Sequence, residues 1–352
     1  MTRAELSALL AELREQYAAY QNKKLALDLS RGKPGAKQLD LLQGMLDCIS
    51  SSSDCRTIDG FDCRNYGVLD GLPEVKQLMG DLMGVAAENV IVGGNSSLNM
   101  MYDTIARAMI YGMGEGNTPW SQQGAIKFIC LTPGYDRHFA ICESLGIEMI
   151  NIPMTSAGPD MDLVESYMSD PQVKMMWVVP KYSNPDGIIF SEETIQRIAN
   201  LKPAAPDFAI IWDNAYCIHE FKGEYVPFPD ILSICAEAGN PNMVYEFAST
   251  SKVTFAGGGT SCMAASEANI QYFTGVFGVQ MISYDKVNQL RHVKYLKDKK
   301  TTLELMKKHA DVLRPKFHAV LDALDTEIAP LGIAEWKRPK GGYFVSLNAM
   351  TG

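Results

Sequence analysis

Apolar and polar residues along the chain follow two periods in turn, and each period predicts a different kind of element. From residue 4 to about 21, apolar residues recur at helical spacing, which predicts an N-terminal amphipathic helix. From about 46 to 285, short apolar runs alternate with helical stretches. The clearest runs predict strands at 89–92, 126–131, 175–179, 208–212 and 243–248. This alternation is typical of an α/β domain with a mostly parallel sheet.

The pattern changes after about residue 285. Residues 285–324 predict one or two long, charged amphipathic helices, and residues 339–345 predict a turn followed by a strand. We therefore expect a large domain at 46–289 and a smaller α+β domain that joins 1–45 to 290–352. A chain of 352 residues, 47% of them hydrophobic, is long enough to bury both cores.

Composition and net charge indicate which class of partner the protein binds. A net charge of −9 argues against nucleic acid or an anionic membrane as the main partner, so small molecules are expected instead. The eight cysteines are scattered without a C-x-x-C pair, which is typical of reduced thiols. The first residues lead directly into a helix, with no signal peptide, and no apolar run is long enough to cross a bilayer. We expect a soluble cytoplasmic protein.

Polar or glycine-containing loops follow four of the five predicted strands. They are Gly93-Gly94-Asn95-Ser96-Ser97, Pro180-Lys181-Tyr182-Ser183-Asn184-Pro185-Asp186-Gly187, Asp213-Asn214-Ala215-Tyr216 and Ser249-Thr250-Ser251-Lys252. In an open α/β sheet, ligands bind beyond the carboxyl ends of the strands. The sequence therefore predicts that these loops converge on one site.

The side chains in these loops fit one kind of cofactor chemistry. A lysine amine forms a Schiff base with a carbonyl cofactor such as pyridoxal phosphate (PLP), so Lys252 is the candidate attachment point and catalytic residue. PLP acts as an electron sink only while its ring nitrogen stays protonated, and Asp213 is placed to maintain that proton. Asn184 and Tyr216 are suitable donors to the ring's 3′ oxygen.

A phosphate needs backbone N–H groups at the start of a helix. Gly94, Asn95 and Ser96 form such a loop, and the hydroxyl groups of Ser96 and Ser249 can assist it. Each feature has an ordinary reading by itself, because a loop lysine is usually solvated and Asp213 could simply cap a helix. Their order and spacing favour the cofactor, since Asp213 follows Asn184 by 29 residues and Lys252 follows Asp213 by 39.

The three motifs together resemble the fold-type I aminotransferases. The N-P-x-G turn at Asn184, the D-x-A-Y strand end at Asp213 and the S-x-S-K loop before Lys252 match that family in type and order, and the resemblance runs from about Leu27 to the last residue. Further segments resemble the aspartate aminotransferase subgroup Ic, also called alanine–glyoxylate aminotransferase-like. They are Ser30-Arg31-Gly32-Lys33-Pro34-Gly35, Gly94-Asn95-Ser96-Ser97, Pro133-Gly134-Tyr135-Asp136-Arg137-His138 and Lys286-Val287-Asn288-Gln289-Leu290-Arg291-His292.

The resemblance implies roles at further positions. Tyr135 matches the aromatic residue that stacks on the PLP ring, and Tyr66 matches the tyrosine that reaches the phosphate of the neighbouring subunit, which implies a homodimer with shared active sites. Gly32 matches the glycine whose backbone approaches the substrate, and Asn184 lies beside the substrate as well. Arg31 and Arg137 either bind substrate carboxylates or remain surface residues.

Two positions depart from the family pattern. Many members have a phosphate-binding arginine eight residues after the lysine, where this chain has Thr260, so the phosphate would depend on backbone groups, hydroxyls or another basic residue. The family's arginine for the substrate α-carboxylate lies beyond the turn at Gly341-Gly342-Tyr343-Phe344, and the sequence stops at Gly352. The clamp is then missing or the sequence is a fragment, and we expect a fragment.

The expected reaction is a ping-pong amino transfer in which Lys252 moves a proton from the substrate Cα as general base and acid. Aspartate or glutamate with a 2-oxo acid is the leading substrate hypothesis. An aromatic or kynurenine-type substrate and a non-catalytic PLP-binding effector module remain open. A nicotinamide dehydrogenase is disfavoured because 112–116 lacks the G-x-G-x-x-G spacing, and a metal hydrolase because the five histidines show no ligand spacing.

Overall fold

A computed structural model describes residues 1–27 and 31–350, and it divides into two units, Met1–Lys33 and Pro34–Gly352, which are taken separately. The first unit contains helix α1 (Arg3–Asn22). The Thr2 hydroxyl accepts a hydrogen bond from the Glu5 backbone at 3.3 Å, and the Glu5 carboxylate accepts one from the Thr2 backbone at 2.6 Å. This reciprocal capping explains why the helix begins where it does, and it confirms the predicted N-terminal helix.

The second unit alternates helices with strands along most of its length. Its helices are α2 (Ala36–Asp40), α3 (Pro73–Met83), α4 (Ser97–Tyr111), α5 (Asp136–Ser144), α6 (Met161–Ser166), α7 (Glu192–Ala199), α8 (Ile231–Glu237), α9 (Glu267–Gln280), α10 (Lys286–Leu296) and α11 (Lys299–Ala323). Its strands are β1 (Val90–Val92), β2 (Lys127–Thr132), β3 (Glu148–Thr155), β4 (Gly158–Pro159), β5 (Val173–Val178), β6 (Ala209–Asp213), β7 (Val244–Ser249), β8 (Ser261–Ala264), β9 (Ala334–Trp336) and β10 (Leu347–Ala349).

One sheet organises the second unit. Its eight strands lie in the order β1-β8-β7-β6-β5-β2-β3-β4. The neighbours from β7 through β6, β5 and β2 to β3 are parallel, whereas β8 is antiparallel to both β1 and β7. The α/β fold class with a mostly parallel sheet is confirmed. All five predicted strands are present, and β5, β6 and β7 each end at a loop that the sequence singled out.

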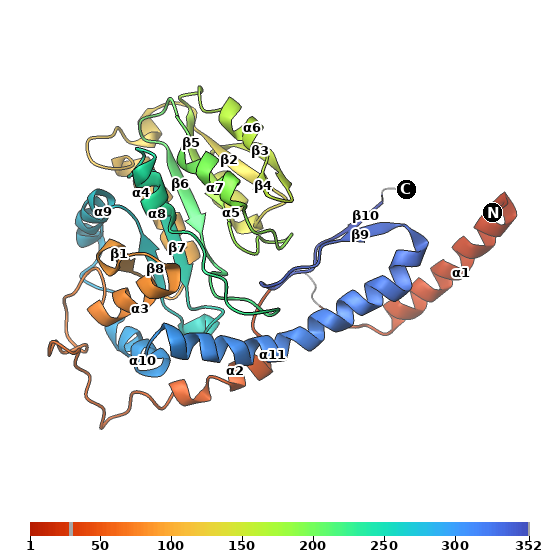
Figure 1. The fold of residues 1–352 in the computed structure, drawn as a ribbon, viewed down its shortest axis with the longest axis horizontal. Helices are drawn as coiled ribbons and strands as arrows, with labels where there is room; N and C mark the ends of the chain where they lie inside the picture. Colours follow the sequence, from red (N-terminus) through yellow and green to blue (C-terminus); the bar gives the residue numbers. More distant parts are fainter. Residues whose placement is uncertain (28–30, 351–352) are drawn as a thin grey trace. The chain divides into compact units, whose positions relative to one another are not determined.

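Helices cover both faces of the sheet (Figure 1). Alternate residues of each strand enter one of two apolar clusters, as Ile210 and Ile211 of β6 illustrate. The first cluster packs against α3, α6, α7 and α8, and the second against α4, α5 and α9. Because both faces are buried, the central strands are mostly apolar, which is why short apolar runs identified them in the sequence. No helix in the described ranges has the length and apolar character needed to cross a membrane.

The C-terminal part confirms one prediction and corrects another. The stretch predicted as one or two helices forms α10 and α11. The strand predicted within 339–345 is wrong, because the short antiparallel pair is instead β9 with β10. Gly342 has a φ of +77°, and Gly341 lies so close to the His219 carbonyl that a Cβ there would stand 2.5 Å from it. This segment is therefore a tight turn against the sheet domain. The predicted division at 46–289 stays a prediction.

Candidate active site

Lys252 lies in a tight turn immediately after β7. The turn is closed by two backbone hydrogen bonds to the Thr250 carbonyl, from Val253 at 2.8 Å and Thr254 at 2.7 Å. The lysine is half-buried, and its Nζ lies 4.9 Å from the centroid of the Tyr216 ring. Burial lowers the pKa of the Lys252 amine, and the charge of Asp213 opposes that shift. An amine with a lowered pKa is more often in its neutral, nucleophilic form.

Asp213 is the last residue of β6 and is only 4% exposed. Its Oδ2 lies 3.1 Å from His138 Nε2, and the His138 ring stacks on Trp177 with centroids 4.1 Å apart. Among the described residues, Oδ1 of Asp213 is buried without a hydrogen-bond partner. Buried carboxylate oxygens are rarely left in this condition unless a ligand completes the site. One oxygen is thus held by the protein and the other is available to a cationic N–H group.

Three aromatic or amide side chains surround this carboxylate. Tyr135 is the N-cap residue of α5, and its ring meets the His138 ring edge to face at 5.1 Å. Tyr135, His138 and Asn184 all line one small cavity of about 20 Å³. Tyr216 is 3% exposed, and burial together with the nearby Asp213 charge raises the pKa of its phenol. Its hydroxyl is therefore a hydrogen-bond donor at neutral pH.

The predicted anion loop lies beside the lysine turn. Ser251 Oγ donates to the Asn95 carbonyl at 3.1 Å, and Ser249 Oγ donates to Ser251 Oγ at 3.2 Å. Ser96 is the N-cap residue of α4, yet its side chain makes no capping hydrogen bond. A helix N-terminus presents unpaired N–H groups and a positive dipole end, so it is suited to bind an anion.

The chain can now be compared with known proteins. A family model described as aspartate amino-transferase matches residues 1–352. A relative from Corynebacterium glutamicum, described as aspartate aminotransferase, is 44% identical over 97% of this chain and 79% of its own length. The crystal structure of an aspartate transaminase from the same organism has a TM-score of 0.96 at 43% identity, and the match covers 100% of this chain and 83% of that one.

The chain belongs to the aspartate aminotransferase family. A more distant structure, the α-aminoadipate aminotransferase of Thermus thermophilus complexed with N-(5′-phosphopyridoxyl)-L-leucine, has a TM-score of 0.72 at 20% identity, and the match covers 92% of this chain and 77% of that one. At that identity it supports the fold alone. The predicted family and the predicted aminotransferase activity are confirmed by these matches.

The structure does not bring all predicted site residues of this aminotransferase together. Arg137 is exposed and lines an outer hollow of about 350 Å³ with Ser96 and Tyr102. Tyr66 is 77% exposed, so its predicted contact with a second subunit stays a prediction. Arg31 and Gly32 belong to the first unit, and their roles also stay predictions.

Sequence reasoning missed two neighbours of Asp213 in this aminotransferase. The sequence includes His138 in a segment that resembles the family and among the histidines without ligand spacing, and it places Trp177 in a predicted strand, but it assigns neither a contact with Asp213. A signal for His138 is present, because it lies three residues after Tyr135 at the start of a helix, and residues at this spacing share a helix face. Trp177 pairs with Ile211 of β6, and Asp213, two residues after Ile211, shares that residue's face of the sheet. No group of three or more possible metal ligands occurs among the described residues.

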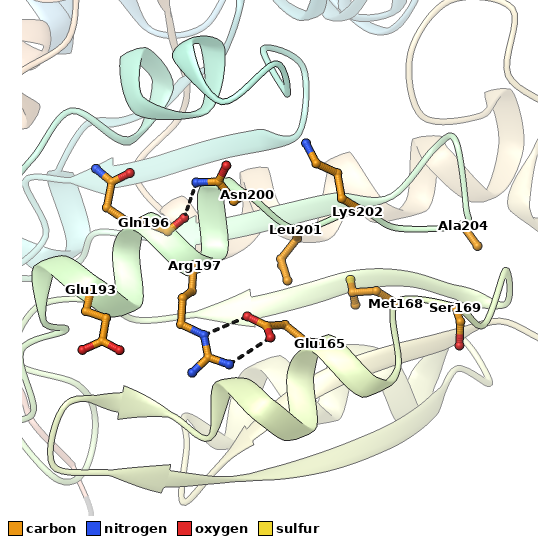
Figure 2. Close-up of a pocket in the computed structure, with 10 residues that line it drawn as sticks. All are labelled: Glu165, Met168, Ser169, Glu193, Gln196, Arg197, Asn200, Leu201, Lys202 and Ala204. Atoms are coloured by element: carbon orange, nitrogen blue, oxygen red, sulfur yellow. Dashed lines mark hydrogen bonds and ion pairs between the residues drawn. The ribbon is translucent and has the colours of Figure 1, made fainter.

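A larger hollow elsewhere on the aminotransferase does not compete with this site. Figure 2 shows it beside α6 and α7, with a volume of about 640 Å³. Arg197 in this hollow already pairs with Glu165 at 2.8 Å and with Asp162 at 2.6 Å. These exposed ion pairs leave no buried polar group in need of a ligand, so the hollow carries no chemistry of its own.

Proposed function

We propose that this chain binds PLP covalently at Lys252 and transfers amino groups between aspartate or glutamate and a 2-oxo acid. One observation carries the proposal: Asp213 is buried with one carboxylate oxygen unpaired, beside a lysine whose amine pKa is lowered by burial. A protonated pyridine nitrogen is a suitable partner for that oxygen, and a carbonyl group is a suitable partner for the amine.

The neighbouring residues fit the remaining parts of PLP. Tyr135 would hold the face of the ring, and Asn184 and Tyr216 would donate to the 3′ oxygen. The N-terminus of α4, preceded by Gly94, Asn95 and Ser96, would receive the phosphate together with the Ser249 hydroxyl. These assignments follow the family resemblance, and the contacts among Ser249, Ser251 and Asn95 support them.

PLP, when bound, supplies the electron sink that makes the substrate Cα–H bond acidic. The chain contributes the proton transfer. Lys252 Nζ would act on the substrate Cα proton, first as general base and then as general acid. His138 holds one oxygen of Asp213 in place, which would leave the other oxygen for a protonated ring nitrogen.

The substrate assignment rests on similarity, because the Corynebacterium relative is described as an aspartate aminotransferase. Arg31 and Arg137 are the proposed cations for substrate carboxylates, with Gly32 giving the substrate close access to the backbone. We also propose a cytoplasmic homodimer in which Tyr66 of each subunit reaches the other's phosphate. Its exposed ring is available for that contact.

The proposal is tested with purified protein incubated with PLP. Borohydride reduction followed by peptide mapping should find a pyridoxyl label on Lys252. In a separate, unreduced sample, aspartate and glutamate should bleach the visible absorbance band within one turnover, whereas phenylalanine, tyrosine and kynurenine should not. Bleaching by aromatic donors would instead assign an aromatic or kynurenine substrate. A labelled protein that no donor bleaches would support the effector-module reading.

A further inference from the structure

His292, on α10, contacts both sides of the turn that carries Lys252. Its Nε2 lies 3.0 Å from Thr250 Oγ1 and 3.0 Å from Thr254 Oγ1, which are two residues before and after the lysine. Its Nδ1 lies 2.8 Å from the Asn288 carbonyl. The imidazole is 1% exposed, so these hydrogen bonds are shielded from water.

The hydrogen-bond partners define the protonation state of His292. A carbonyl oxygen can only accept, so Nδ1 carries the hydrogen that Asn288 receives, and Nε2 is the acceptor. Thr250 Oγ1 accepts from the Thr260 backbone at 2.8 Å and from the Thr254 hydroxyl at 3.0 Å, so its own hydroxyl hydrogen is the one donated to the single lone pair of Nε2. Burial lowers the pKa of His292 to about 4, so the ring is neutral at physiological pH.

The contacts of His292 also decide whether it could replace the phosphate-binding arginine that many family members have. Thr260 stands at that sequence position, and its Oγ1 lies 3.3 Å from His292 Nδ1, so His292 is the obvious candidate for a substitute cation. A neutral ring with both nitrogens engaged inside the protein cannot serve an anion in that way. Its contacts lead to the lysine turn instead.

We propose that His292 is a positioning residue for catalysis, a neutral imidazole that accepts from the Thr250 hydroxyl, which in turn accepts from the Thr254 hydroxyl, and thereby fixes the turn from which Lys252 reaches its reaction partner. This proposal rests on the function proposed above for Lys252. A general base acts efficiently only when it is held within a few tenths of an ångström of its target, so a loosened turn slows proton transfer more than it weakens substrate binding.

The test compares full-length wild type with His292→Phe, His292→Gln and a control, His318→Phe, which alters an exposed histidine of α11. His292→Phe should lower kcat about tenfold while KM for aspartate changes less than about twofold, as expected when a group that acts in the transition state is misplaced. His292→Gln keeps an acceptor and should recover most of kcat. His318→Phe should match wild type.

Affinities for PLP and for pyridoxal, which lacks the phosphate, separate positioning from anion binding. The proposal expects His292→Phe to weaken both by the same factor, leaving their ratio unchanged. It is overturned if only PLP affinity falls, because His292 would then serve the phosphate, or if kcat equals that of wild type.

If His292→Phe does not fold, Thr250→Val compared with Thr250→Ser asks the same question from the other side of the bond. Val should reproduce the loss of kcat and Ser should not, and equal kcat values in the two variants overturn the proposal. The two proposals fail in different ways. The proposed function fails if the wild-type protein takes no borohydride label at Lys252. The positioning role alone fails if the wild type is labelled and active but the variants have the same kcat.

Discussion

Two lysines follow the strands on either side of β6, and their amines have opposite surroundings. Lys181, after β5, is 1% exposed and donates to Glu220 Oε1 at 2.6 Å, the Cys217 carbonyl at 2.8 Å and the Val226 carbonyl at 2.7 Å. Lys252, after β7, has no hydrogen-bond acceptor for its amine among the described residues, and its amine lies over the Tyr216 ring, near enough to Asp213 to feel its charge. Lys181 thus uses all three donors of its ammonium in hydrogen bonds within the fold, whereas the amine of Lys252 makes no such bond.

The difference shows what separates a structural lysine from a reactive one. Each lysine occupies a loop at the carboxyl edge of the sheet, and the sequence around Lys181 is as polar as that around Lys252. An ammonium has three donors and no acceptor, so three acceptors at hydrogen-bond distance satisfy every donor of Lys181. Lys252 lacks those acceptors, and its amine is therefore free to lose a proton and attack a carbonyl.

The largest expected effect comes from removing the reactive lysine. Lys252→Ala should abolish the borohydride label and lower kcat by about 10⁴-fold or more, the scale seen when a catalytic nucleophile is lost. Lys222→Ala, which removes an exposed lysine, is the matched control and should retain both the label and the rate. Peptide mapping and steady-state kinetics on the two variants check this. A pyridoxyl label that survives in Lys252→Ala would move the attachment point to another lysine.

Much of the site was predictable because its residues stand where strands end. Asn184, Asp213 and Lys252 each follow a fully buried apolar run, and such runs can be recognised locally in the sequence. Parallel pairing then brings their carboxyl ends to one edge without any further information. For this reason the fold class and the residues around Asp213 could be predicted together.

Other contacts depend on packing that no local pattern records. His138 meets Asp213 across 75 residues, and His292 meets Thr250 across 42. Both contacts depend on how a helix lies against the sheet. Strands β3 and β8 were not among the predicted strands: β3 alternates buried with more exposed residues, and β8 has only four residues, so neither forms a clear apolar run. The turn at Gly341 was read as leading into a strand, since its close approach to the His219 carbonyl is visible only in three dimensions.

A stability measurement should sharpen the contrast between the two lysines. Lys181→Met leaves the Glu220 carboxylate, whose side chain is 6% exposed, without its cation, which should lower the free energy of unfolding by about 3–5 kcal/mol. Lys181→Met/Glu220→Gln removes the stranded charge and should recover part of that loss. Lys252→Met, measured on the cofactor-free protein, is the matched control and should cost nothing. Urea unfolding of all three variants checks this. Equal losses of unfolding free energy in Lys181→Met and Lys252→Met would show that the two lysines do not differ in their structural role.

The smallest expected effect is a dependence on pH in the cofactor-free protein. The pKa of Lys252 is lowered from 10.5 by burial, so between the folded and unfolded pKa values the unfolded chain binds more protons than the folded one. The contribution of Lys252 to stability therefore rises with pH across that window, and at neutral pH the buried ammonium is a cost. Lys252→Met should stabilise the cofactor-free protein slightly at pH 7, and the gain should shrink as pH approaches 10.5. Difference unfolding curves against wild type measure this, with Lys222→Met as the exposed control. A gain that grows with pH would mean that the Lys252 ammonium is stabilised in the folded protein, as Lys181 is, and would contradict its assignment as the reactive amine.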